Sequence, residues 1–144
     1  MRRTNMLART LAPMLVSFAL SVPSFAGEAE ISSAQSTIDA QLRAFQSNDG
    51  ALAYSYAAPN VKRIFPNVEI FMGMVESGYR PVRSPRNYAF GKVEEPSGTS
   101  VIQQVLIQGP DGKDYEAVYT LELQPDGVYR ITGVSLRASN ALST

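Results

Sequence analysis

The 144-residue chain contains no cysteine, no histidine and no tryptophan. Without thiol or imidazole groups it can form no disulfide, zinc finger, iron–sulfur cluster, cysteine nucleophile or Ser-His-Asp triad, because the reacting or ligating atoms are missing. A metal site would need clustered carboxylates, and the sequence has no such spacing. We therefore predict no metal and no cofactor.

The first 26 residues have the pattern of a secretory signal peptide. Three arginines lie within the first nine residues, an apolar stretch follows over residues 11–22, and Ser24 and Ala26 are small residues at the cleavage position. The apolar stretch is shorter than the ~20 residues that a membrane span requires. We predict cleavage after Ala26, a periplasmic location, and no membrane span in the mature protein.

Cleavage removes three arginines and no acids, so the mature chain of 118 residues has 10 basic and 13 acidic side chains, a net charge of −3. This balance argues against binding to nucleic acid. A chain of this length can bury one core without disulfides. We predict a flexible lead over residues 27–33, a single domain over 34–136 and a loose tail over 137–144.

The first half of this domain has the apolar spacing of helices. Ile38, Leu42 and Phe45 share one helical face, and the residues from Val68 to Val75 repeat that spacing. Two shorter helical segments are expected between these two helices, and Asp49 is suited to cap the N-terminus of the first of them. Asn67 is suited to cap the N-terminus of the helix that begins at Val68, and Gly78 to follow its last turn. Two prolines within residues 79–87 argue against a helix in that segment.

From residue 88 onward the apolar period becomes two, which predicts strands. Two Pro-Asp-Gly turns separate the later strands, and Gly91 and Gly133 are suited to bulges. The expected strands are 88–95, 100–108, 115–123 and 128–136. Helices followed by this meander predict an α+β fold, with N-terminal helices packed on a curved four-stranded antiparallel sheet. The predicted core residues are Ile38, Leu42, Phe45, Phe71, Val75, Tyr119, Leu121 and Ile131.

Two stretches carry a family resemblance: Gly78-Tyr79-x-Pro81-Val82, and Asp126-Gly127-x-Tyr129-Arg130-Ile131. With them, nearly the whole mature chain resembles a bacterial family known only as domain of unknown function 4864. More distantly it is similar to the NTF2-like (cystatin-like) fold, a cone of helices on a curved sheet. That superfamily includes enzymes, transport factors and binding domains, so the resemblance implies a fold but no single function. The nearer family supplies no catalytic residues.

The candidate ligand-binding residues are Tyr79, Arg83, Arg86 and Tyr119. The two arginines lie on a connector stiffened by prolines and could bind the carboxylate of a small organic acid, while Tyr119 would contact its apolar body. Alternatively, arginines beside a helix C-terminus satisfy its carbonyl groups and serve only local structure.

Tyrosine hydroxyls and carboxylates offer weaker candidates. Tyr56, Tyr115 and Tyr119 either line a cavity or belong to the core. The acidic residues occupy polar positions of their elements, so we predict no catalytic residue. Three functions remain open: a binding or interaction module for a small acid or apolar ligand, an NTF2-like enzyme of isomerase, dehydratase or hydrolase type acting on a small apolar substrate, and a structural domain that forms a homodimer through its sheet.

Overall fold

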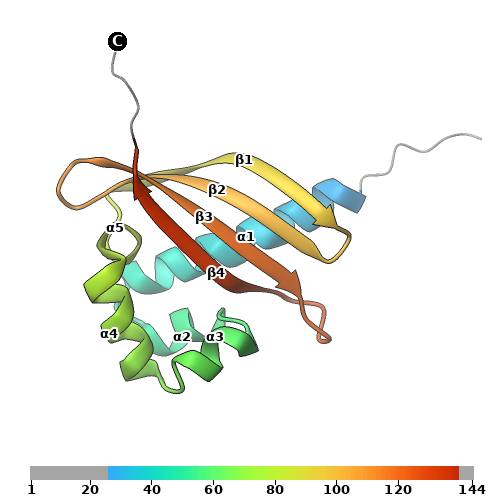
Figure 1. The fold of residues 1–144 in the computed structure, drawn as a ribbon, viewed down its shortest axis with the longest axis horizontal. Coiled ribbons are helices and arrows are strands. Elements are labelled where there is room, and N and C mark those ends of the chain that lie inside the picture. Colours follow the sequence, from blue (N-terminus) through green and yellow to red (C-terminus); the bar gives the residue numbers. More distant parts are fainter. Residues whose placement is uncertain (1–25, 140–144) are drawn as a thin grey trace, which may run out of the picture.

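A computed structural model describes residues 26–139, in which five helices precede four strands (Figure 1). The elements are α1 (Ala26–Gln46), α2 (Gly50–Ser55), α3 (Pro59–Ile64), α4 (Val68–Gly78), α5 (Arg80–Arg83), β1 (Asn87–Ser97), β2 (Ser100–Gln108), β3 (Asp114–Leu123) and β4 (Tyr129–Ala138). The predicted signal peptide lies outside the described residues except for Ala26.

The four strands form one antiparallel sheet in the order β1-β2-β3-β4, as the sequence predicts. Gly112 and Gly127 close the two Pro-Asp-Gly turns with φ of +79° and +83°, a conformation that glycine adopts without strain. The ladder shifts register at three places: between Phe90 and Val93, between Glu94 and Ser97, and between Thr120 and Leu121. The first shift lies at Gly91 and the third beside Gly133, and such bulges bend a sheet.

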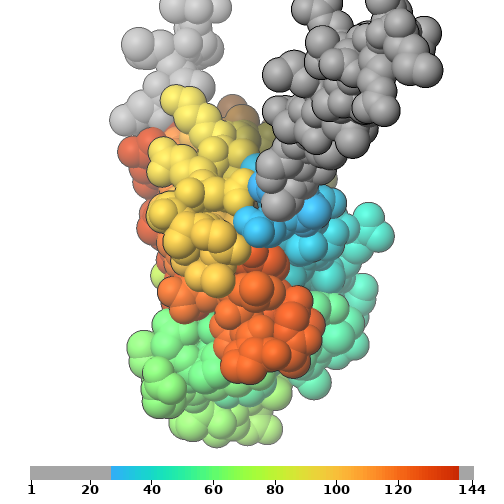
Figure 2. Space-filling model, turned by 90° about the vertical axis from the view of Figure 1, so that its right-hand side faces the viewer, coloured from blue at the N-terminus to red at the C-terminus, as the bar shows by residue number. Residues whose placement is uncertain are grey.

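The helices cover one face of this sheet. Figure 1 shows α1 running across the sheet, and α1 contacts β1, β2 and β4. Helix α3 contacts β4 and α5 contacts β2, whereas α4 packs on α2 and α5. In Figure 2, the green helices lie below the orange turn that joins β3 to β4. Within residues 26–139 no helix is long and apolar enough to cross a membrane.

The expected helix caps form. The carboxylate of Asp49 accepts a hydrogen bond from the backbone N–H of Leu52 at 3.1 Å, and the Asn67 side chain accepts one from Ile70 at 2.9 Å. All eight predicted core residues are at most 5% exposed. The helical and strand periods therefore locate the core correctly.

The structure differs from the sequence predictions at four places. Residues 27–33 form the first turns of α1 instead of a flexible lead, because their polar side chains occupy its exposed face. A one-turn helix, α5, forms despite Pro81, because a proline in the first turn loses no helical hydrogen bond. Gly78 is the last residue of α4, and β4 continues to Ala138, into the predicted tail.

Candidate functional site

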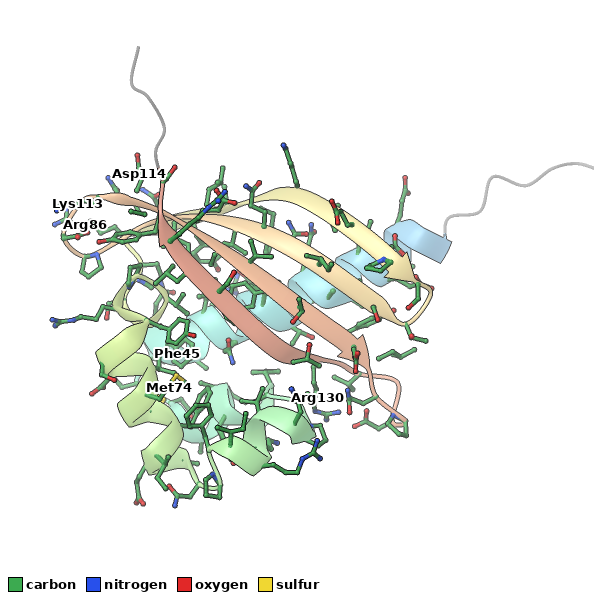
Figure 3. All side chains as sticks on the ribbon, in the orientation of Figure 1. Phe45, Met74, Arg86, Lys113, Asp114 and Arg130 are labelled. Carbon is green, nitrogen blue, oxygen red and sulfur yellow. The ribbon has the colours of Figure 1, made fainter. Side chains whose placement is uncertain are left out.

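A cavity of about 260 Å³ lies between β4 and the helices. Its walls come from α1, α3, α4, α5 and the segment Ile131–Val134 of β4. Figure 3 shows Phe45 of α1 and Met74 of α4 on the side of these helices that faces β4, and both residues line the cavity.

Hydrogen bonds connect the helical side of the cavity wall to β4. The backbone N–H of Ala58 donates to the carbonyl of Ile131 at 2.8 Å, which joins the start of α3 to β4. The hydroxyl of Tyr79 donates to the carbonyl of Val134 at 3.2 Å and connects the end of α4 to the same strand. A hydrogen bond thus connects the C-terminal end of α4 to β4, and the cavity lies beside this hydrogen bond.

The aromatic walls are packed against one another. Phe45 and Phe71 stack with ring centroids 6.3 Å apart, and Tyr54 meets Phe71 at 5.2 Å. The hydroxyl of Tyr54 donates to the carbonyl of Phe65 at 2.6 Å, which holds the loop between α3 and α4. These contacts make the wall stiff, so the shape of the cavity is largely preformed.

Four polar side chains of the cavity wall donate hydrogen bonds to backbone carbonyls. Nε2 of Gln41 donates to Ala53 at 3.2 Å, Nδ2 of Asn60 to Thr132 at 2.9 Å, the hydroxyl of Thr132 to Thr120 at 3.1 Å, and the Tyr79 hydroxyl to Val134 as above. No charged side chain belongs to the cavity wall in the described part of the chain. The wall is therefore neutral and mostly apolar.

Of the four predicted ligand-binding residues, only Tyr79 lines this cavity. Arg83 instead holds the end of α1: Nη1 donates to the carbonyl of Phe45 at 2.6 Å and Nη2 to the Asn48 side chain at 2.7 Å. Its Nε lies 3.5 Å from a carboxylate oxygen of Glu76. Arg83 thus serves the C-terminal end of α1 through a tertiary contact, whereas the sequence alternative placed the arginines at the C-terminus of the adjacent helix.

Arg86 lies elsewhere. Its Nη2 donates to the carbonyl of Pro110 at 2.9 Å in the turn between β2 and β3. In Figure 3 it lies beside Lys113 and Asp114, away from Phe45 and Met74. The structure therefore does not bring Arg83 and Arg86 together with Tyr79 around the cavity.

Tyr119 is fully buried in β3 and does not line the cavity. Its hydroxyl is buried and has no hydrogen-bond partner among the described residues. Burial raises the pKa of this hydroxyl above its ordinary value, because the ionised form would lose its hydration. Tyr56 and Tyr115 are also absent from the cavity wall, and Tyr115 donates to the Asp111 carboxylate in the turn.

The resolved carboxyl pKa shifts lie outside the cavity. The pKa of Asp111 is lowered by the hydrogen bond from Tyr115, and that of Asp126 by the hydrogen bond from Arg130. The pKa of Glu95 is raised by its hydrogen bond with Glu30. Within the described residues, no group of three or more acidic side chains lies close enough to hold a metal ion.

Sequence reasoning missed Gln41 and Asn60. Gln41 lies three residues after Ile38 and four before Phe45, on the apolar face of α1, and it is 3% exposed. A polar residue in the middle of an apolar face was the available signal, because such a side chain must be buried with a partner. Asn60 gave no comparable signal.

Comparison with known proteins identifies the family. A family model described as "Domain of unknown function (DUF4864)" matches residues 28–144. The chain belongs to this family. The DUF4864 match covers all of the described elements except the first two residues of α1.

Two further comparisons add little. A crystal structure of a "known function protein" from Kribbella flavida DSM 17836 is 17% identical, with a TM-score of 0.47; the match covers 76% of this chain and 89% of that chain. The comparison with curated proteins found no match.

Proposed function

We propose that this DUF4864 domain is a binding module that holds a small, neutral, apolar molecule in the cavity between β4 and the helices. The cavity itself, about 260 Å³ and bounded by aromatic and aliphatic side chains, is the observation that carries the proposal. Apolar walls with a few polar groups are typical of small-molecule sites. A cone of helices on a curved sheet, the arrangement of the NTF2-like resemblance, is consistent with a ligand at this place.

The volume suits a molecule of two fused rings. A cavity of about 150 Å³ holds benzene, and scaling by heavy atoms gives about 225 Å³ for a nine-atom bicycle. The cavity of about 260 Å³ exceeds that requirement slightly. We therefore expect ligands the size of benzofuran, not of a steroid or a long-chain lipid.

The charge of the wall supports a neutral ligand over the organic acid that the sequence suggested. A carboxylate buried there would lose its hydration without a cation to replace it, since Arg83 and Arg86 bind backbone carbonyls elsewhere. The wall also holds no carboxylate that could act as a general base. Binding is thus better supported than the isomerase or dehydratase alternative.

The proposal includes export. The predicted cleavage site after Ala26 falls at the first residue of α1, so the mature chain would retain the rest of this helix. A periplasmic binding domain of this kind would meet small apolar molecules that have crossed the outer membrane or are about to leave the cell.

Calorimetric titration with benzofuran tests the proposal. Val61 lines the cavity from α3, so Val61→Phe should fill it and weaken benzofuran binding by at least about tenfold. Ile70→Phe is the matched control, because Ile70 is 48% exposed and does not line the cavity. Equal weakening by both variants would contradict the proposal, and so would the absence of binding to the wild type by benzofuran and by its bicyclic analogues indole and 1-methylindole.

A further inference from the structure

The amide of Gln41 has a defined orientation in the cavity wall. Its nitrogen lies 3.2 Å from the carbonyl oxygen of Ala53. A carbonyl oxygen can only accept, so the nitrogen must face Ala53 and Oε1 must point the other way. Nothing in the described chain donates a hydrogen bond to Oε1, although the residue is only 3% exposed. Gln41 therefore contributes to the cavity wall an acceptor that has no partner among the described residues.

Other polar side chains of the cavity wall also use a donor group within the protein. Nδ2 of Asn60 and the Tyr79 hydroxyl also donate to backbone carbonyls of β4. Each of these bonds uses one donor of its side chain, while the oxygen lone pairs remain. The wall therefore offers more free acceptor oxygens than free donors, because only the second N–H of each amide is left to meet a ligand carbonyl or carboxylate.

We infer that the ligand is a hydrogen-bond donor, an apolar body with a hydroxyl or ring N–H group that bonds to Oε1 of Gln41. The inference rests on the proposed function and specifies the class of ligand that the cavity selects. A ligand that fills the cavity excludes water from this acceptor, so a ligand that donates a hydrogen bond to it should bind more tightly than an isostere without a donor.

Three bicyclic probes test this on the wild-type mature protein. Indole has a ring N–H donor, benzofuran has an oxygen in the same position, and 1-methylindole has the donor blocked. Indole should bind about fivefold more tightly than benzofuran, the ratio typical of one neutral hydrogen bond. Equal affinity, or tighter binding of benzofuran, overturns the inference while leaving the cavity proposal standing. If none of the three binds, the proposed function fails as well.

Two variants assign the effect to Gln41. Gln41→Met removes the acceptor and should bring the indole-to-benzofuran ratio close to one, with benzofuran affinity largely kept. Gln35→Met is the matched control, because this glutamine of α1 also loses a hydrogen bond, to Gln103 at 2.9 Å, but does not line the cavity. A preserved ratio in Gln41→Met overturns the assignment. The wild-type probe comparison decides the inference even if Gln41→Met folds poorly.

Discussion

The hydroxyl of Tyr119 is a buried polar group that gains nothing from its surroundings. It is 0% exposed and has no partner in the described chain, so the fold carries its desolvation cost without compensation. A tyrosine at this position still contributes a large apolar ring to the core beneath the helices.

Tyr119→Phe should therefore stabilise the protein. Removing an unpaired buried hydroxyl without changing the ring should raise the free energy of unfolding by about 1 kcal/mol in urea titration. A loss of stability would mean that the hydroxyl has a partner, such as a bound water.

The same variant predicts a change in alkaline stability. The folded pKa of Tyr119 is raised above 10.0, so the folded state keeps its proton where the unfolded state loses it. Stability from this group is complete below pH 10 and is lost as the pH rises above it. Tyr119→Phe should therefore flatten the decline of the unfolding free energy above pH 10, measured against wild type.

Arg83 and Arg86 provide a test of structural role against ligand binding. Arg83→Ala removes charge-assisted bonds to Phe45 and Asn48 and should lower the free energy of unfolding by about 2 kcal/mol. Arg86→Ala, at an exposed residue, should change it by less than about 0.5 kcal/mol. Neither variant should alter the benzofuran affinity. Weaker binding in either variant would support the ligand-binding role that the sequence suggested for these arginines.

At the residue scale, the sequence predicts which side chains are buried better than it predicts their hydrogen-bond partners. Tyr119 was placed correctly in the core by its strand period, but nothing in the period says whether its hydroxyl finds an acceptor. Arg83 was recognised as lying near a helix C-terminus; that it serves α1 rather than its neighbour α4 depends on tertiary packing.

At the scale of elements, the position of a residue along β3 decides how deeply it is buried, even on one face of the sheet. Leu121 is 1% exposed, and Leu123, two residues later and on the same face, is 38% exposed. Leu121 pairs with Ile131 beside the bulge, where β4 meets the helices, while Leu123 lies at the end of the strand.

Leu121→Ala should thus cost about 2 to 5 kcal/mol of unfolding free energy, the range for a buried leucine that leaves a cavity. Leu123→Ala, the control on the same strand, should cost less than about 1 kcal/mol. Similar losses in the two variants, measured by urea unfolding, would mean that Leu121 is no more deeply packed than the end of β3.

Element boundaries were predicted well where the signal was periodic and poorly where composition was the guide. The strand ends beside the two Pro-Asp-Gly turns lie within one residue of their predicted limits, because these turns mark them. Away from these turns, β1 and β4 each end two residues beyond the predicted limit. Residues 27–33 were assigned as flexible on polarity alone, although Glu28 in the first turn of α1 favours a helix through its dipole.

At the scale of the whole molecule, the α+β fold follows from the order of periods in the sequence, but the cavity does not. Its volume depends on how far α4 stands from β4, and that distance is decided by the Tyr79–Val134 contact and the packing of α4 on α2 and α5. Neither is visible in spacing or composition.

Export is also a property of the whole chain. We predict that the periplasmic protein begins at Gly27, because small residues precede this position and the apolar stretch before them is short. Intact-mass spectrometry of the periplasmic fraction measures this directly. A protein that retains residues 1–26 in the membrane fraction would contradict the prediction.

The central claim, that the ligand occupies the cavity beside β4, is tested most directly by methyl NMR of the mature chain. Its two methionines are Met72 and Met74, and only Met74 lines the cavity; Met72 lies near Gly50 instead. Titration with indole should shift the Met74 methyl signal and give cross-relaxation from indole protons to it, while the Met72 signal stays nearly unchanged. Saturable indole binding without a response at Met74, or with the larger response at Met72, would contradict the account.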